Sequence, residues 1–387
     1  MQNSGGLESG GFVKPIRILA ILAGCTGLVW AHNAPLAGQA RGFGAGAEGR
    51  PADYLKGCKV APEGRGGGGR GPGRGPAAPA TFDAREYTVT GIPGVITAGA
   101  KWTEVWHGDG NNADGLIGTQ DGGVLFAQND NNQAGKIDKN GNVTFPYSGL
   151  NVSGSLATNS KGMLFVLNRG YTGLSGTAHD YASIEELAPQ SKVIANKDPN
   201  GDPMDCIGGV LNDAVAASNG GVYFSMAGLY YAAPDGKVTK QDAKDGNPRL
   251  GTNGIILTPD EKHVIVTNAG TLVILDVSPD GQLSNQRKFA DLDRTGLAEG
   301  QGAGGDGSCF DAAGRFYISA ANGVQVFDKD GKHLGNIPAP RNLVSLTISG
   351  SQRKTLYAVT AANVNGARKV WIESIPLLAS GPKGRGK

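Results

Sequence analysis

Short apolar runs separated by polar turns recur along most of this chain. The clearest unit covers residues 251–267, where a polar residue precedes a glycine, an apolar run, a Pro-Asp turn and a second apolar run. This pattern predicts a β-hairpin, because Pro and Asp favour the turn between two strands. Five further copies follow the same plan, and the second apolar runs begin near Leu125, Leu164, Tyr223, Val264, Phe316 and Leu356.

The spacing of these units predicts the architecture. Successive copies lie 39 to 59 residues apart, and a strand-only repeat of about 40 to 50 residues is typical of propeller blades. Six copies therefore predict an all-β, six-bladed β-propeller of four-stranded antiparallel blades over residues 86–378. We expect a strand at residues 87–89 to pair with the last blade near residues 370–375 and close the ring.

A residue with a side-chain oxygen heads the first strand of every unit, and we call these six positions the ring residues. They are Asp114, Ser153, Asn212, Asn253, Asp306 and Ser345. Because the innermost strands of a propeller surround its channel, we expect these side chains to converge on the channel mouth.

Four of the ring residues have the chemistry of a metal site. Asp114, Asn212, Asn253 and Asp306 offer hard oxygen ligands with two negative charges, which suits Ca²⁺ or another divalent cation such as Mg²⁺, Mn²⁺ or Zn²⁺. The alternative is that their Asp-Gly and Asn-Gly pairs are only turn dipeptides. Their recurrence in register with the repeat favours the metal site.

The two ends of the chain differ from the repeats. Lys14 and Arg17 precede an apolar run at residues 18–30, which predicts a signal peptide at 1–31 and an extracytoplasmic protein, periplasmic or secreted. A lipid anchor at Cys25, or an uncleaved segment, is the alternative. Residues 32–85 have the Gly, Arg and Pro content of a flexible linker, and we expect a basic disordered tail at 379–387.

Composition and motifs exclude several functions. A formal net charge of +2 favours neither nucleic acid nor an acidic partner, and we expect a monomer without a membrane span in the mature protein. The glycine-rich residues 300–305 have no strand–helix context for a dinucleotide, and the chain lacks a Gly-x-Ser-x-Gly motif. In an oxidising compartment we expect Cys58 to pair with Cys206, whereas Cys309 is interpreted as a core thiol.

Three segments resemble one known family. Residues 251–260, residues 212–224 with Asn212-Asp213 ahead of a Gly-Gly-Val-Tyr-Phe run, and residues 306–317 are similar to the senescence-marker-protein/gluconolactonase (regucalcin-like) family. The resemblance spans roughly residues 105–360. It implies a six-bladed propeller with one divalent cation in the channel, which hydrolyses lactones or, in related enzymes, organophosphate esters.

The resemblance also implies roles for single residues. Asn253 and Asp306 match metal ligands of the family, and Asp306 would also act as base or nucleophile. Asn212 matches a residue that binds metal or substrate. Asp114 stands where the family has Glu, so its shorter side chain would draw that ligand back.

Substrate recognition departs from the family pattern. Val210 replaces an Arg that grips sugar lactones, which argues against strict gluconolactone specificity. Arg169 would replace that charge, unless it is an exposed turn residue. We expect Glu299 to contact substrate and Asp213 to support the site from behind, and these two carboxylates are also the reserve candidates for the base.

The main hypothesis is therefore a divalent-metal-dependent lactonase or esterase, in which the metal polarises the carbonyl and Asp306 acts as base or nucleophile. The alternative is a non-catalytic propeller that binds a ligand or partner protein and uses a structural Ca²⁺. A lyase is a third class and would need a histidine base, for which His107 and His179 are the candidates.

Overall fold

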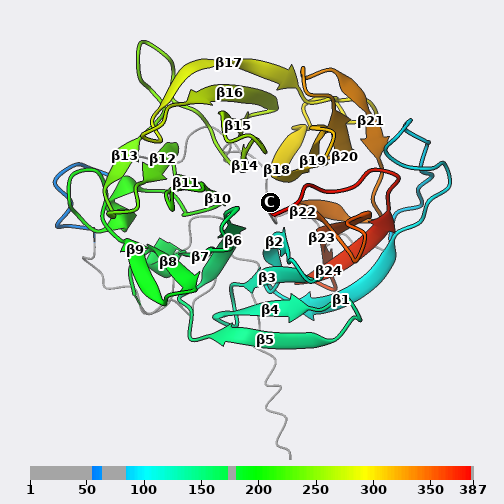
Figure 1. Ribbon diagram of the computed structural model, residues 1–387, viewed down its shortest axis with the longest axis horizontal. Coiled ribbons are helices and arrows are strands. Elements are labelled where there is room, and N and C mark those ends of the chain that lie inside the picture. The colour runs from blue at the N-terminus through cyan, green and yellow to red at the C-terminus, as the bar shows by residue number, and fades with distance from the viewer. Residues whose placement is uncertain (1–54, 63–83, 173–179, 385–387) are drawn as a thin grey trace, which may run out of the picture. The chain divides into compact units, whose positions relative to one another are not determined.

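A computed structural model of the protein describes residues 55–62, 84–172 and 180–384. Six four-stranded antiparallel sheets surround a common centre (Figure 1), as the repeat predicts. The second strand of each sheet begins within one residue of the predicted position. The signal peptide predicted at 1–31 lies outside the described residues.

Blades 1 to 3 follow one another along the chain, and each runs from its innermost to its outermost strand. Blade 1 contains β2 (Asp114–Gly118), β3 (Val124–Gln128), β4 (Gln133–Ile137) and β5 (Val143–Ser148). Blade 2 contains β6 (Ser153–Thr158), β7 (Leu164–Asn168), β8 (Ser183–Ala188) and β9 (Lys192–Ala195). Blade 3 contains β10 (Ala214–Ala216), β11 (Val222–Ser225), β12 (Leu229–Ala232) and β13 (Val238–Lys240).

Blades 4 and 5 repeat this order, and blade 6 takes its outermost strand from the start of the propeller. Blade 4 contains β14 (Ile255–Leu257), β15 (His263–Asn268), β16 (Thr271–Val277) and β17 (Leu283–Asp291). Blade 5 contains β18 (Gly304–Phe310), β19 (Phe316–Ala320), β20 (Gly323–Phe327) and β21 (His333–Ile337). Blade 6 contains β22 (Asn342–Ser349), β23 (Thr355–Val364), β24 (Ala367–Pro376) and β1 (Thr103–Asp109). Short 3₁₀ helices lie at η1 (Gly170–Thr172) and η2 (Met204–Ile207).

The ring closes through β1 and not through residues 87–89, which corrects the predicted closing strand. β1 pairs antiparallel with β24, from Thr103 opposite Ser374 to Asp109 opposite Lys369. The earlier segment cannot extend as a strand, because a turn at Ile92–Ile96 follows it, with the Ile92 amide bonded to the Ile96 carbonyl. Val89 packs in the core there and is 1% exposed.

The core of the protein lies between neighbouring blades. Tyr223 and Tyr231 of blade 3, for example, pack against Leu257 and Val264 of blade 4. Comparable apolar clusters join the other adjacent blades, so the sheets stack face to face around the ring. This stacking explains why second strands such as β3, β7 and β19 are buried on both faces, whereas the outermost strands β1 and β5 are largely exposed.

Two segments outside the blades are fastened to them. Cys58 and Cys206 form the predicted disulfide, which holds residues 55–62 of the predicted linker to η2 between blades 2 and 3. The amide of Lys59 also donates to Asp202 Oδ2 at 2.7 Å. Cys309 is a buried thiol that takes no part in this disulfide, as expected.

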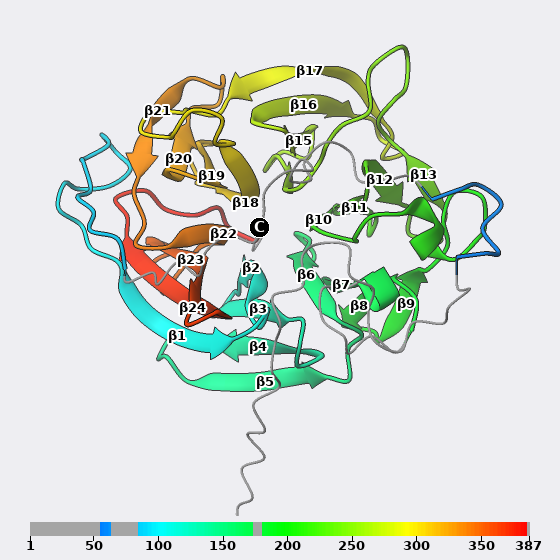
Figure 2. The same ribbon diagram turned by 180° about the vertical axis from the view of Figure 1, so that it is seen from behind.

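The chain after β24 is ordered through residue 384, whereas we expected a disordered tail from residue 379. The Ser380 carbonyl accepts from the Ala312 amide at 2.7 Å, and the Gly381 amide donates to the Arg353 carbonyl at 2.7 Å. In Figures 1 and 2 this segment runs from β24 towards the ring centre. Basic composition alone predicted disorder, but these backbone bonds and the burial of Ala379 fix the segment. Among the described residues no helix has the length and apolar character to cross a membrane.

Candidate functional site

The ring residues lie at one end of the six innermost strands, as predicted. Asn212 and Asn253 come just before β10 and β14, and the other four lie within their strands. In blades 1, 2, 5 and 6 the innermost strand carries a register shift beside its ring residue. Such bulges bend a strand and redirect its side chains. The bulges therefore help to turn the ring residues towards the channel mouth.

Glycine follows the ring residue where neighbouring innermost strands approach closely. A Cβ on Gly115 would lie 2.4 Å from Ser155 Cα, and one on Gly254 would lie 2.0 Å from the Asp306 carbonyl oxygen. A Cβ on Gly307 would lie 2.6 Å from Ser345 Cα. These glycines make room for the next blade, so the interpretation of the Asp-Gly and Asn-Gly pairs as turn dipeptides is wrong.

A series of hydrogen bonds connects three of the predicted ligands across the mouth and reaches the residue before the fourth. Arg169 Nη2 donates to Asp114 Oδ2 at 3.0 Å and to Asn212 Oδ1 at 3.2 Å. Asn212 Nδ2 donates to Asn253 Oδ1, and Asn253 Nδ2 donates to the Gly305 carbonyl at 3.3 Å. Gly305 directly precedes Asp306, so the structure brings all four blades of the predicted site together.

Arg169 is a buried member of this site and not an exposed turn residue, which corrects that expectation. It is 2% exposed, and its remaining donors reach the Leu211 carbonyl at 3.0 Å and Asn129 Oδ1 at 2.5 Å. Gly154 provides the space, because a Cβ there would lie 2.2 Å from Arg169 Nε. The sequence position after β7 does not reveal this, since the acceptors come from blades 1, 2 and 3.

A second guanidinium lies at the blade 6 side of the mouth. Burial lowers the pKa of Arg368, against the opposing effect of Asp114, Asp130 and Asp306, whose charges act on it. Burial also raises the pKa of Asp130. Arg368 Nε, Asp130 Oδ1 and Asn129 Nδ2 are buried polar atoms without a hydrogen-bond partner among the described residues. Groups of this kind normally bind water or a ligand, and none of the three residues was predicted. The polar run at residues 129–132 was the available signal for Asn129 and Asp130.

Asp213 directly follows the ring residue Asn212 and accepts hydrogen bonds from the two neighbouring blades. Its Oδ1 accepts from Ser155 Oγ at 2.9 Å, and its Oδ2 accepts from the Ile255 amide at 3.1 Å. The carboxylate therefore joins blades 2, 3 and 4 at the point where the other blades carry a glycine or, in blade 6, a leucine.

Two other predicted residues lie away from the hydrogen-bonded ring. Glu299 is exposed in the connection between β17 and β18. His107 is exposed on β1 and bonds to Glu104 Oε1 at 2.7 Å, so it is not the channel base that a lyase would need. Its place on the outermost strand of blade 6 explains the difference. His179 lies outside the described residues.

The ring residues fit a hard cation by their donor chemistry. Oxygen is the only ligand type at Asp114, Asn212, Asn253 and Asp306, and carboxylate and amide oxygens are what Ca²⁺ prefers. Only two of the four are carboxylates, and the described residues contain no group of three or more His, Cys, Asp or Glu side chains that could hold a metal. A cation at the four-residue site would share Asp114 and Asn212 with the Arg169 guanidinium.

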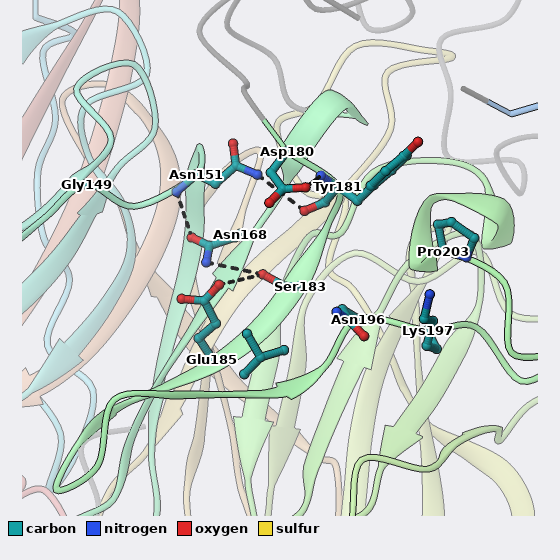
Figure 3. A pocket seen from close by; sticks show the side chains of 11 residues that line it. Gly149, Asn151, Asn168, Asp180, Tyr181, Ser183, Glu185, Asn196, Lys197 and Pro203 are labelled. Atoms are coloured by element: carbon teal, nitrogen blue, oxygen red, sulfur yellow. Dashed lines mark hydrogen bonds between the residues drawn. The ribbon is translucent and has the colours of Figure 1, made fainter. Parts of the chain in front are cut away.

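A separate cavity of about 240 Å³ lies over blade 2 and contains none of the ring residues. Figure 3 shows one polar wall, in which Asn168 Nδ2 donates to Ser183 Oγ at 3.4 Å and Ser183 Oγ donates to Glu185 Oε1 at 2.8 Å. Lys197 and Asn196 lie across from this wall. Asn168, which lines the cavity, directly precedes Arg169 in the sequence. The cavity nevertheless shares no lining residue with the ring.

Fold and site together define a class of protein: a six-bladed propeller with acidic, amide and guanidinium groups gathered at one mouth of its channel. Residues 151–362 match the family model of the SMP-30/gluconolactonase/LRE-like region. The chain belongs to this family, which confirms the resemblance seen in its motifs.

Individual relatives are distant. The gluconolactonase of Zymomonas mobilis subsp. mobilis is 24% identical over 176 residues, which cover 40% of this chain and 48% of that enzyme. This chain thus spans about half the length of that curated relative. A gluconolactonase structure from Xanthomonas campestris has 18% identity and a TM-score of 0.56, covering 78% of this chain and 98% of that one. Regucalcin from Agrobacterium tumefaciens, a calcium-binding protein, has 16% identity and a TM-score of 0.52, covering 72% and 94%. At these identities the structural likeness shows the fold.

Proposed function

We propose that the protein hydrolyses a lactone or a related ester at the ring residues, with the help of a divalent cation. The observation that carries this proposal is the series of hydrogen bonds at the mouth, which connects Asp114, Asn212 and Asn253 and ends at Gly305, the residue directly before Asp306. Family membership supports lactone hydrolysis as the reaction type. Of the divalent cations, Ca²⁺ suits the oxygen donors best.

Each ring residue has a proposed task. Asp306, partly buried on β18, accepts a proton from the attacking water or attacks the carbonyl carbon itself. Asn253 and Asn212 bind through their amide oxygens, and Asn212 also contacts the substrate. A cation held by Asp114, Asn212, Asn253 and Asp306 supplies Lewis-acid polarisation of the carbonyl oxygen.

The surroundings of the ring favour a polar substrate. Arg368 Nε, Asn129 Nδ2 and Asp130 Oδ1 are buried without a hydrogen-bond partner in the described part of the chain, and hydroxyl groups of a substrate would satisfy both donors and the acceptor. Val210 supplies no charge to a sugar lactone, so we expect a range wider than gluconolactone. Glu299 remains a proposed substrate contact, because the exposed connection that carries it leads into β18 and Asp306.

A panel of lactones and esters tests the function, with metal content measured on the same preparation. We expect turnover that a chelator abolishes and Ca²⁺ restores. Because a ligand of the native state stabilises it by RT ln(1+[L]/Kd), chelation should remove about 2.7 kcal/mol when Ca²⁺ is at a hundredfold excess over Kd. Bound Ca²⁺ without turnover on any substrate would favour the non-catalytic, ligand-binding propeller instead.

We also propose that the protein works outside the cytoplasm, as a monomer. The apolar run at residues 18–30 motivates the location outside the cytoplasm. The Cys58–Cys206 disulfide supports this location, because structural disulfides form in oxidising compartments. Mass spectrometry of the native protein would distinguish cleavage near residue 31 from lipidation at Cys25. A cytoplasmic protein that retains Met1 would contradict the proposal.

A further inference from the structure

Arg169 holds two of the four oxygens that a divalent cation would use. Its Nη2 lies 3.0 Å from Asp114 Oδ2 and 3.2 Å from Asn212 Oδ1. A guanidinium carries a full positive charge at every accessible pH. The charge of Asp114 is therefore already neutralised, and both side chains are already oriented, by a cation that belongs to the protein.

The fold is built to keep Arg169 in this place. The side chain is buried, and its three nitrogens bond to groups of blades 1, 2 and 3. It lies against Gly154, where a methyl group would overlap its Nε. A flexible arginine on the surface would have neither the space beside a glycine nor an acceptor for each of its nitrogens.

From this geometry we infer that Arg169 is a competitor of the divalent cation for Asp114 and Asn212, and that it weakens cation binding at the ring. The inference rests on the proposed function, in that the cation binds at these four residues. Cation and guanidinium repel each other, and each draws on the same lone pairs. A charge within about 4–6 Å commonly shifts an ionic equilibrium by one to three powers of ten.

Calorimetric titration with Ca²⁺ alone tests the inference on the full chain. Arg169→Gln removes the charge but keeps an amide donor for Asp114, and we expect its Kd for Ca²⁺ to fall at least about tenfold. Arg169→Lys keeps the charge and should remain within about threefold of the wild type. Arg315→Gln is the control for the loss of a paired arginine, because Arg315 bonds to Asp311 in the turn at the opposite end of β18.

A second variant protects the test if Arg169→Gln folds poorly. Gly154→Ala keeps Arg169 in the chain but fills the space that its side chain occupies. Since Gly154 does not adopt a positive φ, its backbone conformation suits alanine as well. We expect tighter Ca²⁺ binding here too, together with a larger rise of Tm on adding Ca²⁺ than in the wild type. An unchanged or weaker affinity in both folded variants would overturn the inference.

The outcomes separate the inference from the proposed function. If the wild type hydrolyses a lactone and the Arg169 variants bind Ca²⁺ with unchanged affinity, the proposed hydrolase function stands and the competition is refuted. Tighter binding in Arg169→Gln without turnover on any substrate would support the competition and refute the hydrolase. Absence of Ca²⁺ binding in every variant would refute both the competition and the metal site.

Discussion

Neighbouring blades approach so closely at the channel that glycine, which has no Cβ, is needed at the contact. At Gly254 an added Cβ would lie 2.0 Å from the backbone oxygen of Asp306, which is part of β18 and cannot move aside as a side chain would. The same residue is therefore needed for the stacking of blade 4 on blade 5 and for the position of Asp306. Residue choice at the ring follows packing as much as chemistry.

We expect Gly254→Ala to lower the free energy of unfolding by about 1–3 kcal/mol, because overpacking forces the backbone of two blades apart. Urea denaturation measures the loss. Gly302→Ala is the matched control, since no atom lies within 4 Å of its added Cβ, and it should stay within about 0.5 kcal/mol of the wild type. Equal stability of the two variants would contradict the close approach of blades 4 and 5.

Asp306→Asn should separate catalysis from binding. The amide keeps an oxygen ligand but loses the charge and the basicity, so kcat should fall about 10²- to 10⁴-fold even at saturating Ca²⁺. Asn212→Ala should instead change Ca²⁺ affinity or KM. Kinetics on a substrate from the panel would decide, and a kcat for Asp306→Asn within threefold of the wild type would direct attention to Asp213 and Glu299.

At the scale of the strand pairs, the turns carry their own stabilising bonds. Asp138 Oδ1 accepts from the amides of Asn140 and Asn142, and Asp328 Oδ1 accepts from those of Asp330 and Lys332. Gly141 and Gly331 supply the positive φ in the same turns. Turns of this kind can be read from the sequence, because their geometry depends on residues that are adjacent along the chain.

The turn between β2 and β3 should make blade 1 sensitive to acid. The hydrogen bond from Lys136, followed by that from Thr119, lowers the pKa of Asp121 from 3.8 to about 2. The unfolded chain therefore binds the proton more readily, so this contribution is complete above about pH 4 and is lost as the pH falls through 2.

We expect Asp121→Asn to cost less than about 1 kcal/mol at pH 7, since Asp121 is half-exposed, and to lose that difference from the wild type as the pH falls below 4. Urea denaturation at a series of pH values measures both effects. Asp330→Asn, which removes an exposed pair with Lys329, is the control. A deficit that persists unchanged at pH 2 would rule out ionisation as its cause.

On the scale of the whole molecule, two pairings join distant parts of the chain. β1 and β24 come from opposite ends of the propeller and complete one blade. The Cys58–Cys206 disulfide links positions 148 residues apart and encloses blades 1 and 2. Both close long loops in the folded protein, but only the disulfide is covalent and therefore also constrains the unfolded chain.

Replacing both cysteines by serine should lower the free energy of unfolding by about 2–4 kcal/mol, mainly through the greater freedom of the unfolded chain. Denaturation of the double variant, compared with the wild type under reducing and non-reducing conditions, measures this. Cys309→Ser serves as the control for a buried thiol outside any disulfide. Wild-type stability in the double variant would mean that the disulfide adds nothing to the stability of the fold.

The sequence by itself determined the blade count, the starts of the second strands and the positions of the ring residues. These features are periodic or local, so they survive without knowledge of distant contacts. Only the tertiary structure decided which strand closes the ring, where Arg169 points and why Gly115, Gly254 and Gly307 follow their ring residues. Each of these depends on atoms of another blade. Arg169 shows the reason most clearly. Its acceptors Asn129, Leu211 and Asn212 lie about 40 residues away along the chain on either side, and only the stacking of blades 1, 2 and 3 brings them to one side chain.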